Sequence, residues 1–500
     1  MPSLPDLPEP SRWLRRALLV NPPSGLYRRD GRCQSRVEDQ AVRVILPPHD
    51  LALVAAIVRE AGAEARVGDY PAMGASWDRL RADLEAFKPD LILFNVTAAT
   101  ADADLGAARL ARELFPTLLT IGCGEVFDRA GEHLLETCPE LDLALFGEPE
   151  ATFQVLTESA RGRGVRYPLD IEIRSRLGAL LWRDPDGEES VTRQAGPALV
   201  ADLDSLPLPA RDLLDNSLYR SPETGRPLTT IKANRGCPSK CIFCPAGRMS
   251  GYRLRLRSPR QVVQELLECR TKFGIRDFLF DGDTFTLNKR WLLELCDRIA
   301  HKSPLRDIRW GCNSRVDTMD AERAKAMRRA GCILVAFGVE SGDQELLNAM
   351  KKGTRVEQAE QAVAVCKAAG LATHAFFVIG LPWETRESLD RTYRFIQKLN
   401  TDLFDINIAT PLPGTDLYDL VRKEGLLREN LPPGNYAQAM ADTRTLPAEF
   451  LTRWRRNALL KLYARPRYVA HMLLRAWRTG CLPFYLRAAW GRLKGLVRNG

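Results

Sequence analysis

Three cysteines lie close together in the middle of the chain, in the segment NRGCPSKCIFCPAG at residues 234–247. Cys237, Cys241 and Cys244 are separated by three and then two residues, and no histidine follows them before His301. A tetrahedral zinc site needs four ligands, commonly two pairs, so zinc would require a fourth ligand from elsewhere. Three thiolates suit a 4Fe-4S cluster that leaves one iron open. The spacing therefore predicts an iron–sulfur centre whose open iron can chelate an amine and a carboxylate.

The other nine cysteines are scattered singly and are expected to be small buried side chains. The N-terminal segment is proline-rich and acidic, unlike a secretory signal. No apolar run approaches the ~18 residues of a membrane span. These features predict a cytoplasmic protein whose cysteines do not form a disulfide framework.

The positive charge of the chain is concentrated at one end. Arg453–Gly500 contains twelve Lys or Arg and no Asp or Glu, which leaves −3 for residues 1–452 out of a formal net charge of +9. The body therefore lacks the basic surface expected of a nucleic-acid-binding protein.

Short apolar runs ended by Gly, Pro, Asp or Asn alternate with helical patterns between residues 16 and 150, as expected for buried parallel strands and their crossover helices. The expected strands are 16–21, 63–70, 90–96, 117–124 and 142–148. This alternation predicts a doubly wound α/β sheet that binds its ligand at the carboxyl ends of the strands.

A second alternating region with a longer period begins at residue 228. Six strand–helix units are expected there, with strands at 228–235, 276–283, 307–314, 332–341, 372–380 and 402–410. They predict a partial (β/α)6 barrel with its site at the carboxyl ends of the strands. The expected domains are thus 1–150, a linker with a hairpin at 151–227, the barrel at 228–425, and a basic helical extension at 426–500.

CPSKCIFC resembles the cysteine loop of the radical S-adenosylmethionine (SAM) enzymes, and it follows the first barrel strand as in that family. The resemblance implies that the three cysteines ligate the cluster and that the open iron binds the amino and carboxylate groups of SAM. Reductive cleavage of SAM would then give a 5′-deoxyadenosyl radical, with the electron supplied by a flavodoxin or ferredoxin.

Further segments at strand ends resemble the SAM-binding segments of the same family. Phe243 resembles the aromatic residue near the adenine, and the resemblance assigns the methionine amino group to FLFDGDTFT at 278–286. NSRVD at 313–317 would contact the carboxylate or ribose, GVESGD at 338–343 the ribose or methionyl group, and FFVIGLPWET at 376–385 the adenine. The residues so implied are Asp281, Gly282, Asp283, Asn313, Arg315, Glu340, Ser341, Ile379 and Gly380. Any one polar residue of this set could instead be a solvated strand end, and Asp343 and Thr385 could be helix N-caps.

A doubly wound domain followed by this barrel resembles the cobalamin-binding subclass of the family, over roughly residues 15–425. Further similarities are NPP at 21–23, IGCGEVF at 121–127 and FGEPEATF at 146–153, although Cys123 replaces part of the Gly-Gly pair of most relatives. None of the five histidines lies in an Asp-x-His-x-x-Gly motif. The resemblance thus implies cobalamin without a protein histidine below the cobalt.

Three functions remain open at this point. The first is radical C-methylation of a small-molecule or lipid-like substrate, and the second is oxidative cyclisation or rearrangement without methyl transfer. The third is a non-catalytic cobalamin or cluster sensor, which the retained SAM segments disfavour. A tRNA methylthiolase is disfavoured because the N-terminal half lacks that family's three cluster cysteines.

The C-terminal tail mixes Arg with Trp, Phe and Leu in helical patterns interrupted at Pro466. This is the composition of helices that lie in a membrane interface, but it also suits a helical lid on the barrel. We therefore expect either a peripheral membrane contact or a structural lid.

Overall fold

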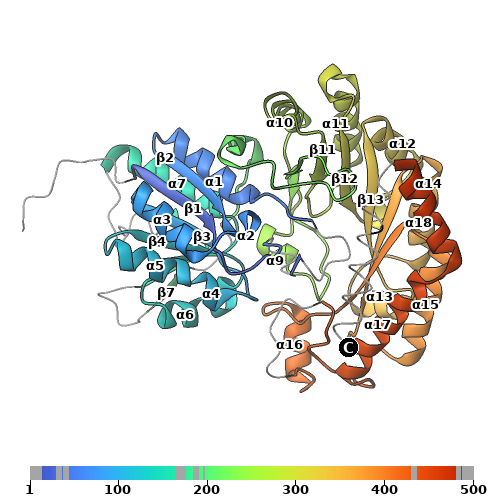
Figure 1. Cartoon of the computed structure of the whole chain (residues 1–500). Helices are drawn as coiled ribbons and strands as arrows, with labels where there is room; N and C mark the ends of the chain where they lie inside the picture. Colours follow the sequence, from blue (N-terminus) through green and yellow to red (C-terminus); the bar gives the residue numbers. More distant parts are fainter. Residues whose placement is uncertain are drawn as a thin grey trace, which may run out of the picture. The chain divides into compact units, whose positions relative to one another are not determined.

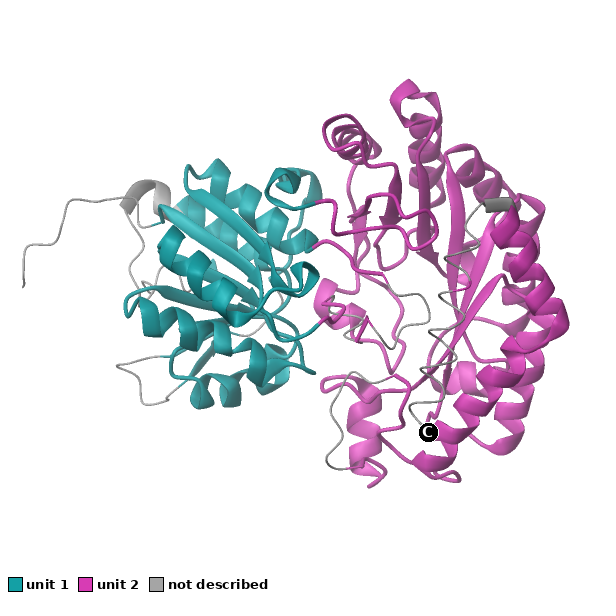
Figure 2. Cartoon of the chain, in the orientation of Figure 1, with its two compact units in different colours: residues 1–25, 48–215 teal, residues 26–47, 216–500 magenta. Residues whose placement is uncertain are grey.

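The structure is a computed structural model that describes residues 14–29, 36–37, 44–163, 176–183, 191–194, 198–428, 436–479 and 486. The chain forms two compact units (Figure 2). Unit 1 contains residues 1–25 and 48–215, and unit 2 contains residues 26–47 and 216–500.

Unit 1 is built on a seven-stranded sheet of order β2-β1-β3-β4-β5-β6-β7. The first five strands of this order are parallel, while β6 and β7 are antiparallel additions. The strands are β1 (Arg16–Asn21), β2 (Glu64–Asp69), β3 (Leu91–Asn95), β4 (Leu119–Cys123), β5 (Leu143–Leu145), β6 (Leu180–Trp182) and β7 (Thr192–Gln194). The doubly wound α/β fold expected from the sequence is confirmed.

Helices cover both faces of this sheet, as the buried apolar runs of its strands require (Figure 1). One core lies between the sheet and α1 and α7, and the other lies on the opposite face with α3, α5 and α6. The helices are α1 (His49–Glu60), α2 (Tyr70–Met73), α3 (Trp77–Phe87), α4 (Ala101–Asp104), α5 (Gly106–Leu114), α6 (Phe127–Thr137) and α7 (Pro149–Arg163).

The segment expected to be a linker has structure of its own. β6 pairs with β5 and β7 pairs with β6, so the hairpin extends the sheet of unit 1. Two short 3-10 helices follow, Leu203–Ser205 and Arg211–Leu213, and unit 1 ends at Asp215. The boundary between the units therefore lies inside the segment 151–227.

Unit 2 contains six parallel strands in the order β15-β14-β13-β12-β11-β8, the open barrel expected from the sequence. The strands are β8 (Leu228–Ile231), β11 (Asp277–Phe280), β12 (Arg309–Ser314), β13 (Cys332–Glu340), β14 (Ala372–Ile379) and β15 (Leu403–Ile408). A small antiparallel pair, β9 (Asn234–Arg235) and β10 (Arg255–Leu256), flanks the cysteine loop. The helices are α9 (Ala246–Ser250), α10 (Pro259–Lys272), α11 (Lys289–His301), α12 (Ala321–Arg329), α13 (Gln344–Ala349), α14 (Val356–Ala368), α15 (Arg386–Leu399) and α16 (Asp416–Lys423).

The two faces of this sheet carry different side chains. Ala375, Phe377 and Ile379 of β14 belong to the large apolar core that the strands share with the helices. Because side chains alternate along a strand, His374 and Phe376 face the barrel interior. The interior is therefore more polar than the helix-covered side.

The expected helical extension, 426–500, is helical in only part of its described residues, because 436–447 contain no helix and Leu427 forms an antiparallel bridge with Ala441. α17 (Ala448–Tyr463) and α18 (Pro466–Thr479) are separated at Pro466, as expected. The second amphipathic stretch, 481–500, lies outside the described residues apart from Leu486. No helix in the described part of the chain combines the length and apolarity that a membrane crossing requires.

Candidate functional site

The cysteine loop begins directly after β9 and is fixed at its first residue. Gly236 has a φ of +86°, and a Cβ there would lie 2.1 Å from the Arg253 carbonyl oxygen, so only glycine fits. The Gly236 N–H donates a 2.7 Å hydrogen bond to Oδ2 of Asp283. Asp283, which was expected at the SAM site, thus holds the start of the loop against the end of β11.

A second contact fixes the centre of the loop. Arg315, just after β12, donates from Nη1 to Oγ of Ser239 at 2.7 Å and from Nη2 to the carbonyl oxygen of Lys352 at 3.2 Å. A fork of two hydrogen bonds to Asp317 orients the guanidinium. The loop between Cys237 and Cys241 is therefore tied to the strand ends on two sides.

Glu340 is the most unusual residue at the mouth of the barrel. It ends β13 at a register shift and has a φ of +66°, which non-glycine residues seldom adopt. Its carboxylate accepts a 2.6 Å hydrogen bond from Nζ of Lys352, and both side chains are buried, at 8% and 9% exposed. A Cβ on Gly338 would lie 2.5 Å from the Glu340 carboxylate, so Gly338 leaves room for this pair. Such strain and buried charge are typical of functional sites.

The charges of this pair act on the cysteine loop. Burial raises the pKa of the Cys241 thiol, the negative charge of Glu340 adds to the rise, and the positive charges of Lys352 and Arg315 offset only part of it. Burial lowers the pKa of Lys352, but the negative charges of Glu340 and Cys241 outweigh that effect and raise it, so the ammonium stays charged. The two cations beside Cys241 favour the thiolate form that a cluster ligand must take, in opposition to the effect of burial.

The three cysteines of the loop would ligate a cluster and not a single metal ion. Among the described residues, no three His, Cys, Asp or Glu side chains converge closely enough to hold one metal ion. In a 4Fe-4S cluster each thiolate ligates a different iron atom. The residues that would hold the cluster are Cys237, Cys241 and Cys244, on one loop whose turn is closed by a 3.2 Å bond from the Cys244 N–H to the Cys241 carbonyl oxygen.

Gly282, just after β11, lets the side chain of Asn234 lie close against its backbone. A Cβ there would lie 2.1 Å from Oδ1 of Asn234, whose side chain is buried against the Gly282 backbone. Asp281 is also buried, and its N–H bonds the carbonyl oxygen of Ile231 at 3.0 Å. Asp281, Gly282 and Asp283 thus lie beside the start of the cysteine loop, whereas their predicted roles toward SAM stay predictions.

Other predicted residues serve the fold in ways that local sequence did not reveal. Ile379 belongs to the apolar core on the helix side, so its side chain does not face the barrel interior. Ser341 is buried, and its hydroxyl bonds Oγ1 of Thr392 at 3.1 Å and accepts from the Asp343 N–H. The N-cap positions of Asp343 and Thr385 are confirmed.

The remaining predicted residues occupy intermediate environments. Phe243 packs against a small apolar cluster that includes Leu347 and Met350, and Asn313 lies on β12. Gly380 has a φ of +83°, and its N–H donates to Oε2 of the buried Glu384 at 3.1 Å.

Sequence reasoning missed two features of the barrel interior. Lys352 was not singled out because the chain has no local signal that pairs it with Glu340. His374 was not singled out either, but its Nε2 lies 2.8 Å from Oδ2 of Asp405 on the neighbouring strand, and its ring centroid lies 4.3 Å from that of Phe376.

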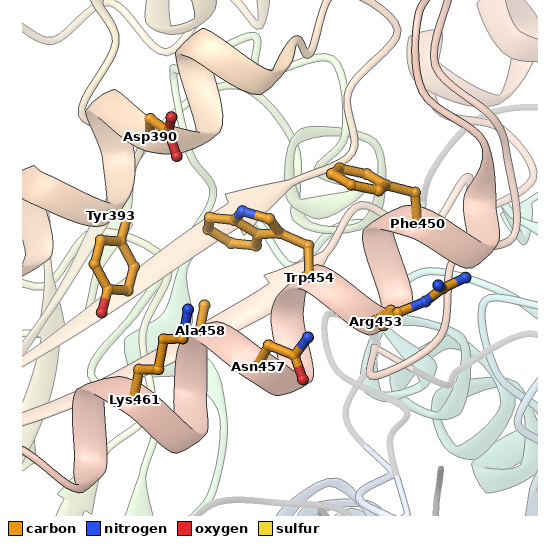
Figure 3. Close-up of a pocket in the computed structure, with 8 residues that line it drawn as sticks. All are labelled: Asp390, Tyr393, Phe450, Arg453, Trp454, Asn457, Ala458 and Lys461. Carbon is orange, nitrogen blue, oxygen red and sulfur yellow. The ribbon is translucent and has the colours of Figure 1, made fainter.

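A groove of about 260 Å3 lies on the outside of unit 2, between α15 and α17 (Figure 3). Aromatic and charged side chains line it, namely Asp390, Tyr393, Phe450, Arg453, Trp454, Asn457, Ala458 and Lys461. None of the predicted site residues lines this groove.

The sequence profile of the radical SAM superfamily matches residues 231–396, from the end of β8 into α15. An uncharacterized methyltransferase of Pyrococcus horikoshii is 30% identical over 423 residues, which cover 84% of this chain and 88% of that protein. The chain belongs to the radical SAM superfamily.

Two further relatives cover both units of this radical SAM protein. The anaerobic magnesium-protoporphyrin IX monomethyl ester cyclase of Cereibacter sphaeroides is 26% identical over 89% of this chain and 72% of that protein. The cytidylyl-2-hydroxyethylphosphonate methyltransferase of Streptomyces wedmorensis is 25% identical over 88% of each chain.

Solved structures share the fold of this radical SAM protein. The methyltransferase TsrM of Kitasatospora setae, with cobalamin and a 4Fe-4S cluster bound, gives a TM-score of 0.65 at 19% identity, covering 83% of this chain and 79% of that one. The cobalamin-dependent SAM radical enzyme OxsB gives 0.69 at 16% identity, covering 95% and 72%. The protein therefore shares the fold of these two structures.

Proposed function

We propose that this protein is a cobalamin-dependent radical SAM enzyme that methylates an unactivated carbon. The observation that carries the proposal is the cysteine loop held at the barrel mouth by Asp283 and Arg315, beside the buried Glu340–Lys352 pair. Three cysteines on one fixed loop match the ligand number of a 4Fe-4S cluster with an open iron.

The chain's own residues would bind and orient the cofactors of unit 2. The bound cluster and SAM together supply a 5′-deoxyadenosyl radical that removes a hydrogen atom from the substrate. The Lys352 ammonium would neutralise negative charge beside Cys241, and Glu340 would accept hydrogen bonds from an amine or from ribose hydroxyls. A one-electron donor such as a flavodoxin or ferredoxin would reduce the cluster.

Unit 1 would hold cobalamin at the carboxyl ends of its strands, where doubly wound sheets bind ligands. Bound cobalamin supplies the methyl group that the substrate receives. The similarity to two methyltransferases supports methylation. The absence of an Asp-x-His-x-x-Gly motif in the sequence supports binding without a protein histidine below the cobalt.

Similarity to the anaerobic cyclase supports a second candidate, oxidation or ring closure without methyl transfer. Product analysis separates the two under reducing, oxygen-free conditions. Methylation yields S-adenosylhomocysteine together with 5′-deoxyadenosine, because one SAM is used for the radical and another restores the methyl donor. Formation of 5′-deoxyadenosine alone in the presence of converted substrate would reject methylation.

We also propose that this is a cytoplasmic enzyme whose C-terminal helices contact an anionic membrane and whose substrate is small or lipid-like. The support comes from α18, where four large apolar side chains are exposed. They are Val469, Leu473, Leu474 and Trp477, with Trp477 76% exposed. Apolar side chains on a basic helix suit the interface of an anionic bilayer. The opposite side of α18 packs on unit 2 through Tyr468 and the His471–Asp402 hydrogen bond, so these four side chains lie on its outer side.

A further inference from the structure

A row of four polar side chains crosses the carboxyl edge of the sheet in unit 1. Asp69, Asn21, Asn95 and Cys123 are the last residues of β2, β1, β3 and β4, which are neighbours in that order. Asn21 is in register with Asp69, and Asn95 is in register with Cys123. The four side chains therefore lie on one rung of the sheet and on the face covered by α1 and α7.

The hydrogen bonds within the row all run in one direction, from Cys123 toward Asp69. Cys123 donates from Sγ to Oδ1 of Asn95 at 3.0 Å, and Asn95 donates from Nδ2 to Oδ1 of Asn21 at 2.7 Å. Asn21 then donates from Nδ2 to Oδ1 of Asp69 at 3.1 Å. The amides of Asn95 and Asn21 each accept one bond and donate the next, so the bonds polarise one another and fix the orientation of both amides.

The thiol at the start of the row is held in its protonated form. Burial and the nearby carboxylates of Asp50 and Glu150 raise the pKa of Cys123 well above its usual value. The neutral thiol can therefore donate to Asn95 throughout the physiological pH range. The only formal negative charge in the row lies at its other end, on Asp69.

The centre of the row coincides with the topological switch point of the sheet. The chain leaves β1 for β2 on one side and returns to β3 on the other, so the crevice opens between β1 and β3. Asn21 and Asn95, the residues that end these two strands, are the pair joined at 2.7 Å. Asn95 is partly exposed, whereas Asn21, Asp69 and Cys123 are buried.

We propose that Asn95 is a contact residue for the corrin of cobalamin and that Cys123, Asn21 and Asp69 are positioning residues that fix its amide. This inference rests on the proposed function and assigns cobalamin-binding residues to unit 1. A corrin ring is rimmed by primary amides, and an asparagine amide both donates to and accepts from such groups.

Equilibrium titration with hydroxocobalamin tests the proposal without requiring a substrate or turnover. The anaerobically reconstituted full-length protein is titrated, and the dissociation constant is measured by equilibrium dialysis. Asn95→Leu and the isosteric Asn95→Asp should both weaken binding about tenfold or more, because each removes the amide donor. Cys123→Ala should weaken binding by a smaller factor, and Cys123→Ser, which keeps a donor, should restore it.

Thr120→Val is the matched control, because Thr120 is fully buried near the amino end of the same β4 and bonds Asp142 there, away from the carboxyl end that carries the row. It should lower the melting temperature without changing hydroxocobalamin affinity. Wild-type affinity in both Asn95 variants would overturn the inference while the proposed function stands. Equal losses in Thr120→Val and the Asn95 variants would also overturn it, as a general stability effect. Failure of the wild type to bind hydroxocobalamin would reject the proposed function itself.

Discussion

Lys352 donates a 2.6 Å hydrogen bond to the Glu340 carboxylate, although α13 separates the two residues along the chain. Both side chains are buried, and Glu340 holds a φ of +66° to reach this position. The pair lies beside Cys241. The strained end of β13 therefore carries charges that act on the cysteine loop.

Removing one partner of this pair should destabilise the protein strongly. Lys352→Met leaves Glu340 buried without its cation, and the loss of one partner in a buried pair costs about 3–5 kcal/mol. We expect a clear fall in the melting temperature of Lys352→Met and a partial recovery in the double variant Lys352→Met/Glu340→Gln. Thermal denaturation of the four members of this double-mutant cycle measures the coupling. Strictly additive shifts would show that the pair is not coupled.

The cluster ligands can be tested by iron content. The reconstituted wild type should hold about four iron and four sulfide per chain and absorb broadly near 400 nm. Replacement of Cys237, Cys241 and Cys244 by Ala should reduce iron by roughly an order of magnitude. Cys366→Ala, at a buried cysteine within the apolar core, should keep the full iron content. Full iron in the triple variant would disprove the assignment.

Gly236 and Gly274 form a matched pair for testing the geometry of the loop. Both have positive φ, at +86° and +67°, but a Cβ at Gly236 would collide with the Arg253 carbonyl, whereas nothing lies within 4 Å of a Cβ at Gly274. Gly236→Ala should therefore displace the loop and lose most of the cluster iron, while Gly274→Ala should retain it. Similar iron contents in the two variants would mean that the loop tolerates the displacement.

Glu384 should make stability depend on pH. Burial raises the pKa of its carboxyl from 4.5 to about 7, against the opposing hydrogen bonds from Ser388 and the Gly380 N–H. The folded state binds the Glu384 proton more tightly than the unfolded state does. The stabilisation that results is fully present below pH 4.5 and is lost as the pH rises through 7. Between pH 5.5 and 8, the melting temperature of Glu384→Gln should therefore fall less than that of the wild type. The exposed Glu387→Gln should follow the wild type, and parallel curves for all three proteins would contradict the prediction.

The apolar surface of α18 can be tested with vesicles. The wild type should co-sediment with phosphatidylcholine vesicles that contain phosphatidylglycerol, and less with phosphatidylcholine alone. Leu473→Ser/Trp477→Ser should reduce sedimentation, because these side chains are 50% and 76% exposed. Met73→Ser, at an exposed apolar residue of unit 1, is the control. Negligible sedimentation of the wild type would leave α18 as a structural lid or as a contact for another protein.

The sequence by itself determined the element types and the cluster loop. Buried strands appear as apolar runs ended by Gly, Pro, Asp or Asn, and the expected strand 16–21 matches β1 residue for residue. The spacing of Cys237, Cys241 and Cys244 is also local. Such features are readable because strand and helix periodicities repeat within a few residues.

The tertiary structure alone decided which side chains meet. The Glu340–Lys352 pair, the row from Cys123 to Asp69 and the orientation of Ile379 toward the helices depend on strand order and register. The hairpin of β6 and β7 was expected as a hairpin, but its addition to β5 was not. A periodicity can reveal that a residue lies on one face of a strand, but it carries no information about which distant strand packs beside it, because that choice is set by the burial of the whole sheet.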